Sequence, residues 1–266
     1  MLLEMIIKFL DKKKIYIYIY IYMIIFDKWF GRLGNNIIQL CNIISIAIAY
    51  KHNIKINLKK LKFFDLSVIE KYFNKYNNSE IITDKDNFFF TSRLPFPNDI
   101  FKQNIKERNK ILQKAFLIKN INKLPENDLV IHIRSGDIFK SKPHPIYVPP
   151  PLSYYTEAID KYKYEKIHII CEDTINPVTN KLRKLYKNAV YEKNTLEKDI
   201  RIILGATNII YSVGTFIPAL MLLSNNNKYI YGEACNKEEL KEYYKIMKPW
   251  KNTIEQRNYI LTYDYN

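Results

Sequence analysis

The side chains best suited to chemistry are an imidazole, a guanidinium and a carboxylate that lie close together in the chain: His132, Arg134 and Asp137. His132 lies within the apolar run Leu129–Ile133, and Arg134 and Asp137 follow it. Such a run is typical of a strand buried on both faces of a parallel sheet. Gly136 permits the sharp turn that would bring Asp137 back toward Arg134. A guanidinium there offers a rigid fork of N–H donors for phosphate oxygens. The alternative is a strand end closed by a plain Arg134–Asp137 salt bridge.

Two further predicted strands also end in polar residues. These candidates are Glu172 and Asp173 after the strand Lys166–Cys171, and Ser212, Gly214, Thr215 and Phe216 at the end of the strand Asn208–Ser212. Ligands of open α/β sheets bind beyond the carboxyl ends of the strands, so the three ends are expected to converge on one crevice. Arg134 suits one phosphate, and the first amides of a helix that opens at Thr215 suit another.

Asp173 can accept hydrogen bonds from a guanine, so the converging strand ends predict a nucleoside diphosphate site. Each signal also has an ordinary structural explanation, because Asp173 and Thr215 are typical helix-capping residues. The prediction therefore depends on the convergence of all three ends.

A glycine-bracketed turn near the N-terminus forms a second group of candidates. It lies between a predicted strand, Met23–Phe26, and a predicted helix, Ile37–Tyr50, which a strand at Ile54–Leu58 follows. Asn35 or Asn36 is expected to cap the helix. The G-x-x-G spacing differs from a dinucleotide fingerprint, so it predicts close backbone approach and no particular cofactor.

The second half alternates strands and helices, which predicts a doubly wound parallel sheet. The expected helices begin at the caps Ser153 and Thr195 and at Pro177 in a first turn. A helix at Ile217–Leu223 and a last strand at Lys228–Tyr231 follow. Residues 59–127 are expected to hold helices around a short strand, with a Phe-rich patch at residues 88–90.

The formal net charge of +15 comes from 42 Lys and Arg residues against 27 Asp and Glu residues. A basic chain suggests nucleic acid as a partner. The excess is mostly Lys, however, and is spread among Ile, Asn and Tyr without a dense basic block. Codons rich in A and T specify these four residue types, so a base-composition bias explains the charge. We expect no nucleic-acid partner, although a positive surface favours anionic ligands.

Cysteine and histidine usage argues against a disulfide framework and against a metal site. Cys41, Cys171 and Cys235 are far apart and form no C-x-x-C pair. The four histidines form no H-x-x-x-H pair. We therefore expect no metal, and a reducing compartment such as the cytoplasm.

Residues 1–22 combine a short apolar segment, Met1–Leu10, with an alternating Ile/Tyr run that ends at Tyr22. A translated ATATAT tract gives this alternation, so we expect residues 1–22 to be a non-structural or mis-annotated extension and Met23 to be the functional start. Neither apolar segment approaches the ~20 residues that span a bilayer. A signal anchor is the alternative.

Several motifs resemble those of the alpha-1,2-fucosyltransferase family and of the related protein O-fucosyltransferases. Residues 31–36 (GRLGNN) resemble the G-G-L-G-N-Q and G-R-x-G-N-Q turns, residues 132–137 (HIRSGD) the H-x-R-R-G-D motif, residues 170–173 (ICED) the F-S-D-D loop, and residues 199–223 the last motif with its S-x-S-S-F end. Tyr154 and Tyr155 fall where the family often has a Tyr pair. The order holds over residues 23–231, which makes the combination more specific than any part.

The resemblance implies a GT-B-like α/β fold of two Rossmann-like lobes with parallel sheets and the donor site in the crevice between them. Residues 23–127 would form the acceptor-side lobe and residues 128–266 the GDP-sugar-binding lobe. The implied activity is an inverting, metal-independent hexosyl transfer that moves fucose from GDP-fucose to a hydroxyl of a glycan or glycoconjugate acceptor. GDP-fucose would be a substrate, and no cofactor is implied.

The resemblance also implies a role for each candidate residue. Arg134 would neutralise the leaving β-phosphate, Ser212, Gly214, Thr215 and Phe216 would hold the diphosphate, Glu172 or Asp173 the guanine, Gly31, Arg32 and Gly34 the donor, and Asn35 would face the fucose–acceptor junction. Asp137 or His132 would be the general base for the acceptor hydroxyl. A general base must be within reach of its proton first and have a suitable pKa second. Asp137 is equally suited to be a structural partner of Arg134.

The chain departs from the family pattern at several positions. Ser135 replaces the family's second arginine, Asn36 replaces a Gln, and the loop His144–Pro151 is an addition. The family's S-S-F is replaced by residues 214–216 (GTF). These differences leave two alternatives open: a GT-B transferase that uses another nucleotide sugar, and a non-catalytic relative that binds sugar nucleotides.

Overall fold

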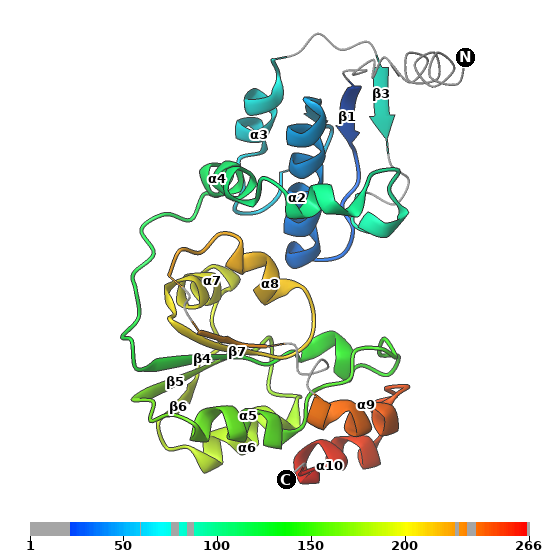
Figure 1. Cartoon of the computed structure of the whole chain (residues 1–266). Coiled ribbons are helices and arrows are strands. Elements are labelled where there is room, and N and C mark those ends of the chain that lie inside the picture. The colour runs from blue at the N-terminus through cyan, green and yellow to red at the C-terminus, as the bar shows by residue number, and fades with distance from the viewer. Residues whose placement is uncertain are drawn as a thin grey trace, which may run out of the picture. The chain divides into compact units, whose positions relative to one another are not determined.

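The structure is a computed structural model that describes residues 22–58, 60–75, 80–83, 88–226, 229–232 and 238–264. The expectations for residues 1–21 and for Cys235 fall outside the described residues. The chain divides into two compact units, Met1–Leu117 and Ile118–Asn266 (Figure 1). The boundary expected from the sequence lies after residue 127. The acceptor and donor roles given to the two halves stay predictions.

The first unit contains a parallel sheet of three described strands with helices packed on it. The strands are β1 (Tyr22–Phe26), β2 (Asn53–Ile56) and β3 (Glu80–Thr83), in the order β2-β1-β3. The helices are α2 (Leu33–Tyr50), α3 (Leu66–Phe73) and α4 (Ile105–Ala115), with 3₁₀ turns at Thr91–Arg93 and Asn98–Lys102. Helices around a short strand were expected between residues 59 and 127. This range does contain α3, α4 and the short strand β3, but β3 pairs with β1 of the sheet.

Helix α2 begins earlier than predicted. Arg32 is its N-cap and makes no side-chain capping bond, so the prediction that Asn35 or Asn36 caps the helix is wrong. Both asparagines lie within the first turns, and the Asn36 amide donates instead to the Phe30 carbonyl at 3.2 Å. Among the described residues, α2 is also the one helix long and apolar enough to cross a membrane, but 67% of that stretch is buried in the fold, as in a core helix.

The second unit contains a parallel sheet of five described strands. They are β4 (Asp128–His132), β5 (Lys166–Ile170), β6 (Ala189–Tyr191), β7 (Asn208–Tyr211) and β8 (Tyr229–Tyr231), in the order β6-β5-β4-β7-β8. The chain runs outward from β4 to β6 and then resumes on the other side of β4 with β7. The order therefore reverses between β4 and β7, which is the place where doubly wound sheets bind their ligands.

Helices cover both faces of this sheet. Those of the second unit are α5 (Leu152–Asp160), α6 (Pro177–Leu185), α7 (Leu196–Gly205), α8 (Phe216–Met221), α9 (Lys241–Met247) and α10 (Ile254–Thr262). Helices α7 and α8 lie on one face and α5 and α6 on the other, with α10 packed against α5 and α6 (Figure 1). The predicted α/β fold with parallel sheets is confirmed.

The helix caps were predicted with mixed success. Thr195 caps α7 and Pro177 occupies the first turn of α6, as expected. Ser153 does not cap α5, because the helix begins at Leu152 and its N-cap is Pro151. The cause is Pro151 itself, which has no N–H to satisfy and fits a helix start.

Candidate functional site

The ends of three strands meet at the carboxyl edge of the second sheet. His132, the last residue of β4, pairs with Ile170 of β5 and with Tyr211 of β7. Just beyond, the Arg134 amide donates to Ser212 Oγ at 3.0 Å, and the Ser212 amide donates to the His132 carbonyl at 3.2 Å. Arg134 and Ser212 are thus joined where the strand order reverses.

Asp137 holds the Arg134 guanidinium along one edge. Nε donates to Oδ1 at 3.3 Å and Nη2 to Oδ2 at 2.9 Å. Gly136 lies between them with φ +57°, which is the turn that the sequence predicted. The side chain of Arg134 is 15% exposed and that of Asp137 41%. Asp137 was considered as a general base and as a structural partner of Arg134. The geometry favours the structural role, because both carboxylate oxygens bind the guanidinium.

Gly214 leaves room for the third nitrogen of the guanidinium. A Cβ built on Gly214 would lie 2.5 Å from Arg134 Nη1, a distance that real Cβ contacts do not reach. The backbone of Gly214 also has φ +106°, a conformation that disfavours any residue with a Cβ. Nη1 therefore faces a glycine backbone on the turn that follows β7.

The expected helix after this turn is shorter than predicted. It was expected at residues 217–223, but α8 spans Phe216–Met221, six residues. Thr215 is its N-cap and makes no side-chain capping bond. A helix this short adds little dipole, so an anion here would depend on Arg134 and on the turn. The Phe216 ring lies 5.4 Å, centroid to centroid, from the His132 ring.

The third strand end is tied to Arg134 through its neighbours. Ser135 Oγ donates to Asp173 Oδ1, which also accepts from the Ile175 amide at 3.0 Å. Oδ2 of Asp173 makes no hydrogen bond in the part of the chain that the structure describes. The Glu172 carboxylate lies against Gly136, where it would meet a built Cβ. The contact of either carboxylate with a guanine stays a prediction.

The remaining candidates lie together in the first unit. Gly31 and Arg32 lie in the turn before α2, Gly34 and Asn35 lie in the first turn of that helix, and the Asn35 amide packs over Gly31. Gly34 is buried, Asn35 half-buried, and Gly31 and Arg32 are exposed. The structure thus gathers the predicted residues into two groups, one in each unit.

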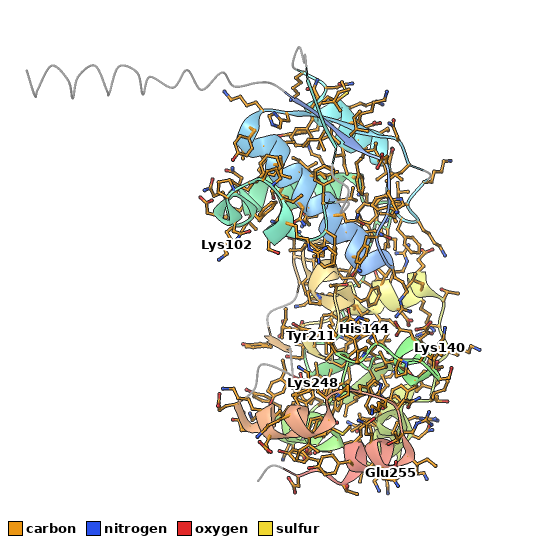
Figure 2. The ribbon with its side chains drawn as sticks, turned by 90° about the vertical axis from the view of Figure 1, so that its right-hand side faces the viewer. Lys102, Lys140, His144, Tyr211, Lys248 and Glu255 are labelled. Carbon is orange, nitrogen blue, oxygen red and sulfur yellow. The ribbon has the colours of Figure 1, made fainter. Side chains whose placement is uncertain are left out.

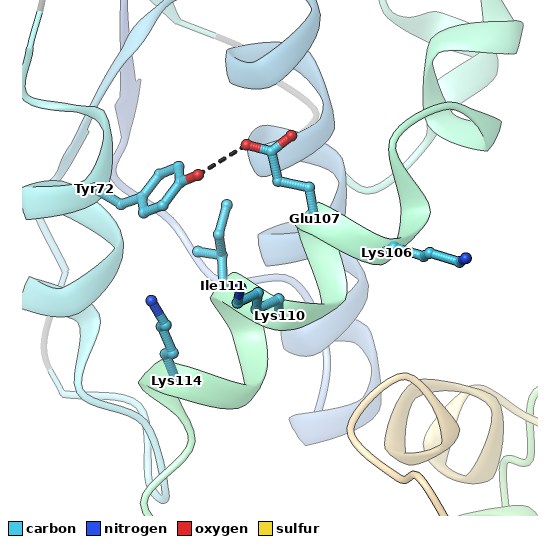
Figure 3. A pocket seen from close by; sticks show the side chains of 6 residues that line it. All are labelled: Tyr72, Lys106, Glu107, Lys110, Ile111 and Lys114. Atoms are coloured by element: carbon cyan, nitrogen blue, oxygen red, sulfur yellow. Dashed lines mark hydrogen bonds between the residues drawn. The ribbon is translucent and has the colours of Figure 1, made fainter.

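The first unit also carries an open groove of about 410 Å³, shown in Figure 3. It is lined by Tyr72, Lys106, Glu107, Lys110, Ile111 and Lys114. Tyr72 donates to the Glu107 carboxylate at 2.8 Å, and the Lys106 side chain points away from the Tyr72 ring. None of the predicted site residues lines this groove.

Burial makes the two described cysteines poor nucleophiles. It raises the pKa of Cys41 and of Cys171 to about 12, so both thiols stay protonated at neutral pH. Cys171 lies 3.7 Å from Thr179 Oγ1 inside the fold. Among the described residues, no three His, Cys, Asp or Glu side chains gather closely enough to hold a metal ion.

Sequence reasoning missed two residues that touch Arg134. Asn176 is buried, and its amide donates to the Arg134 carbonyl at 3.0 Å while Oδ1 accepts from the Val178 amide at 3.0 Å. Tyr147 lies over the guanidinium, with 4.0 Å between Cζ of Arg134 and the ring centroid. An Asn immediately before Pro177 was a readable cap signal, whereas no local pattern indicates the contact of Tyr147.

Comparisons with known proteins find structural similarity alone. No family model and no curated protein matches the chain. It is similar to the crystal structure of POFUT1 in complex with GDP (TM-score 0.48, 10% identity, 81% of this chain and 99% of that chain covered). It is also similar to that of NodZ alpha-1,6-fucosyltransferase soaked with GDP-fucose (TM-score 0.43, 11% identity, 82% and 97% covered). Function is therefore inferred from the chain's own residues.

Proposed function

We propose that the chain is a glycosyltransferase that moves fucose from GDP-fucose to a hydroxyl of a glycan acceptor, with inversion and without a metal. The observation that carries the proposal is the setting of Arg134 at the point where the strand order of the second sheet reverses. Its guanidinium is fixed along one edge by Asp137 and faces the Gly214 backbone with Nη1. A fixed, permanently charged fork suits the diphosphate of a sugar nucleotide.

In the proposed reaction the acceptor oxygen attacks the anomeric carbon of the sugar, and the bond from that carbon to the β-phosphate oxygen breaks. The electron pair stays on the phosphate, where Arg134 stabilises the growing negative charge. A preorganised charge that acts where charge develops is usually the largest catalytic contribution. The proton of the acceptor passes to a general base, for which His132 and Asp137 remain the candidates. Since both oxygens of Asp137 bind Arg134, His132 is the first to test.

Ser135 is the observation that keeps two alternatives to fucose transfer open. It stands where the family that the chain resembles has a second arginine. Its hydroxyl is buried, donates to Asp173 and accepts from the backbone N–H of Asn176. The site thus lacks a guanidinium at this position, which is compatible with another nucleotide sugar or with a relative that binds without catalysis.

The test is transfer from GDP-fucose, GDP-mannose and UDP-sugars to a panel of glycans in the presence of a chelator. Proton NMR of the product reports the anomeric configuration. We expect turnover with GDP-fucose, inversion, and a loss of at least ~100-fold in Arg134→Ala, the size of an effect seen when one donor to a transition-state oxyanion is removed. Arg134→Lys, which keeps the charge without the fork, is the matched control and should retain more activity than Arg134→Ala.

Each outcome decides between the alternatives. Turnover with a uridine sugar would retain the transferase and discard fucose. Binding of GDP without turnover on any acceptor would favour the non-catalytic relative. Near-normal turnover in Arg134→Ala would refute the proposed role of the guanidinium.

A further inference from the structure

No residue of the loop between the 3₁₀ turn Gly136–Phe139 and helix α5 takes part in the chemical steps proposed above. The loop carries His144 and the prolines at positions 143, 145, 149 and 150, and the sequence alone gave no reason for it. In the structure this loop places the ring of Tyr147 over Arg134, with 4.0 Å from Cζ to the ring centroid. Tyr147 thus covers a face of the guanidinium, while Asp137 binds one edge.

We propose that Tyr147 is a positioning residue that holds the guanidinium plane of Arg134 for a diphosphate ligand. The inference rests on the proposed function, because it concerns the same guanidinium. Asp137 fixes two of the three nitrogens, and the aromatic face opposes tilting of the plane. Nη1 is then held toward the Gly214 turn. An ordered fork binds an anion better, because less freedom is lost on binding.

The residues before and after Tyr147 in the chain hold it in place. Its amide donates to the His144 carbonyl at 3.1 Å, which closes a turn, and the two rings lie 5.0 Å apart. The next residue, Val148, is fully buried in the core of the unit. Ile146, by contrast, is 60% exposed on the same turn.

The C-terminal segment anchors this loop by its carbonyl groups. The Trp250 amide donates to the Pro145 carbonyl at 2.9 Å, and the Tyr243 hydroxyl donates to the Pro149 carbonyl at 2.7 Å. At the start of the loop, the Asn252 amide donates to the Lys140 carbonyl at 3.1 Å. Lys140 and His144 are labelled on this loop in Figure 2.

Two of these anchors are themselves core residues. Tyr243 and Trp250 are buried, and the Trp250 indole also donates to the Ile138 carbonyl at 2.6 Å. The loop that carries Tyr147 is thus bonded to the folded core at several carbonyls. This explains why a loop rich in proline, which cannot donate backbone hydrogen bonds, is held in one position.

The alternative is that Tyr147 only contributes packing to the loop. The two explanations differ in how Tyr147 and Arg134 depend on each other. A residue that acts through the guanidinium loses its effect on ligand binding once the guanidinium is gone, whereas a packing residue keeps its effect.

The experiment is a calorimetric titration of the full chain with GDP, for the wild type and for Tyr147→Phe, Tyr147→Leu and Ile146→Ala. The Tyr147→Leu variant is then repeated in the Arg134→Ala background. We expect Tyr147→Leu to raise the Kd of GDP roughly 3- to 30-fold, the range that a cation–π contact allows. Tyr147→Phe, which keeps the aromatic face, and Ile146→Ala should bind like the wild type. In the Arg134→Ala background, Tyr147→Leu should have no further effect.

Two results would overturn the inference. One is wild-type affinity in Tyr147→Leu, and the other is an equal loss from Tyr147→Leu with and without Arg134. Failure of the wild type itself to bind GDP would instead refute the proposed function. A thermal melt of each variant without ligand separates a loss of binding from a loss of folding.

Discussion

Gly214→Ala should weaken diphosphate binding far more than the addition of one methyl group suggests. The new Cβ would lie 2.5 Å from Arg134 Nη1 and 3.6 Å from Cζ. One of the two must move. A shift of the guanidinium would strain its bonds to Asp137, at 2.9 and 3.3 Å, and its contact with the Tyr147 ring. The backbone can move only by leaving the turn that follows β7.

Two costs follow from this geometry. The φ of +106° costs a residue with a Cβ about 1–3 kcal/mol of stability, because that region is sparsely populated. A displaced guanidinium loses a charge-assisted hydrogen bond to phosphate, which is worth about 1.5–3 kcal/mol. At 1.4 kcal/mol per factor of ten, the Kd of GDP should rise about 10- to 100-fold.

The assay is a GDP titration by calorimetry together with a thermal melt of the free protein. Gly214→Ala is compared with Arg134→Ala and with the double variant. In the double variant the Cβ meets no guanidinium, so the strain should still lower the Tm while the Kd stays within about twofold of that of Arg134→Ala. Wild-type GDP affinity in Gly214→Ala would refute the reasoning that Nη1 needs the space above this glycine.

Three further predictions concern buried polar groups. Asn176→Ala should lower the free energy of unfolding by about 2–4 kcal/mol, because it removes a helix cap and leaves the Arg134 carbonyl without its partner; Asn176→Ser should recover part of the loss in a urea titration. Asn42→Ala should cost about 1–3 kcal/mol in the same assay, because the Phe88 carbonyl loses the Asn42 amide at 2.7 Å, and an unchanged midpoint would contradict this. Burial lowers the pKa of His52 from 6.5 to about 4. Between these two pH values the imidazole is protonated in the unfolded chain and neutral in the folded chain. Stability should therefore fall as the pH drops from about 6.5 toward 4, and His52→Asn should flatten that part of the curve.

Much of the second unit could be predicted because its signals are local. Short apolar runs separated by helical periodicity imply parallel strands, and the rule for strand ends placed Arg134, Asp173 and Thr215 at one edge. Their neighbours are joined there by hydrogen bonds and close contacts, as with Arg134 and Ser212. The ion pair of Arg134 with Asp137 was also foreseeable, since Gly136 permits the turn that brings Asp137 back to Arg134.

Other features could not be predicted because they depend on distant parts of the chain. The start of α2 was missed because Asn36 has a partner in the preceding loop, which a capping rule does not consider. The contact of Tyr147 with Arg134 requires a loop whose position is set by Trp250, more than a hundred residues along the chain. No helix or strand was predicted for residues 238–264, and their role as an anchor for that loop is a tertiary effect.

The most direct test of the central claim compares how wild type and Arg134→Ala bind GDP and guanosine, by calorimetry with a chelator present. If Arg134 holds the diphosphate, the wild type should prefer GDP by about 10- to 100-fold or more, as charge-assisted hydrogen bonds to phosphate allow. Arg134→Ala should lose most of that preference while its affinity for guanosine is unchanged. A variant that still prefers GDP over guanosine by the wild-type factor would contradict the claim.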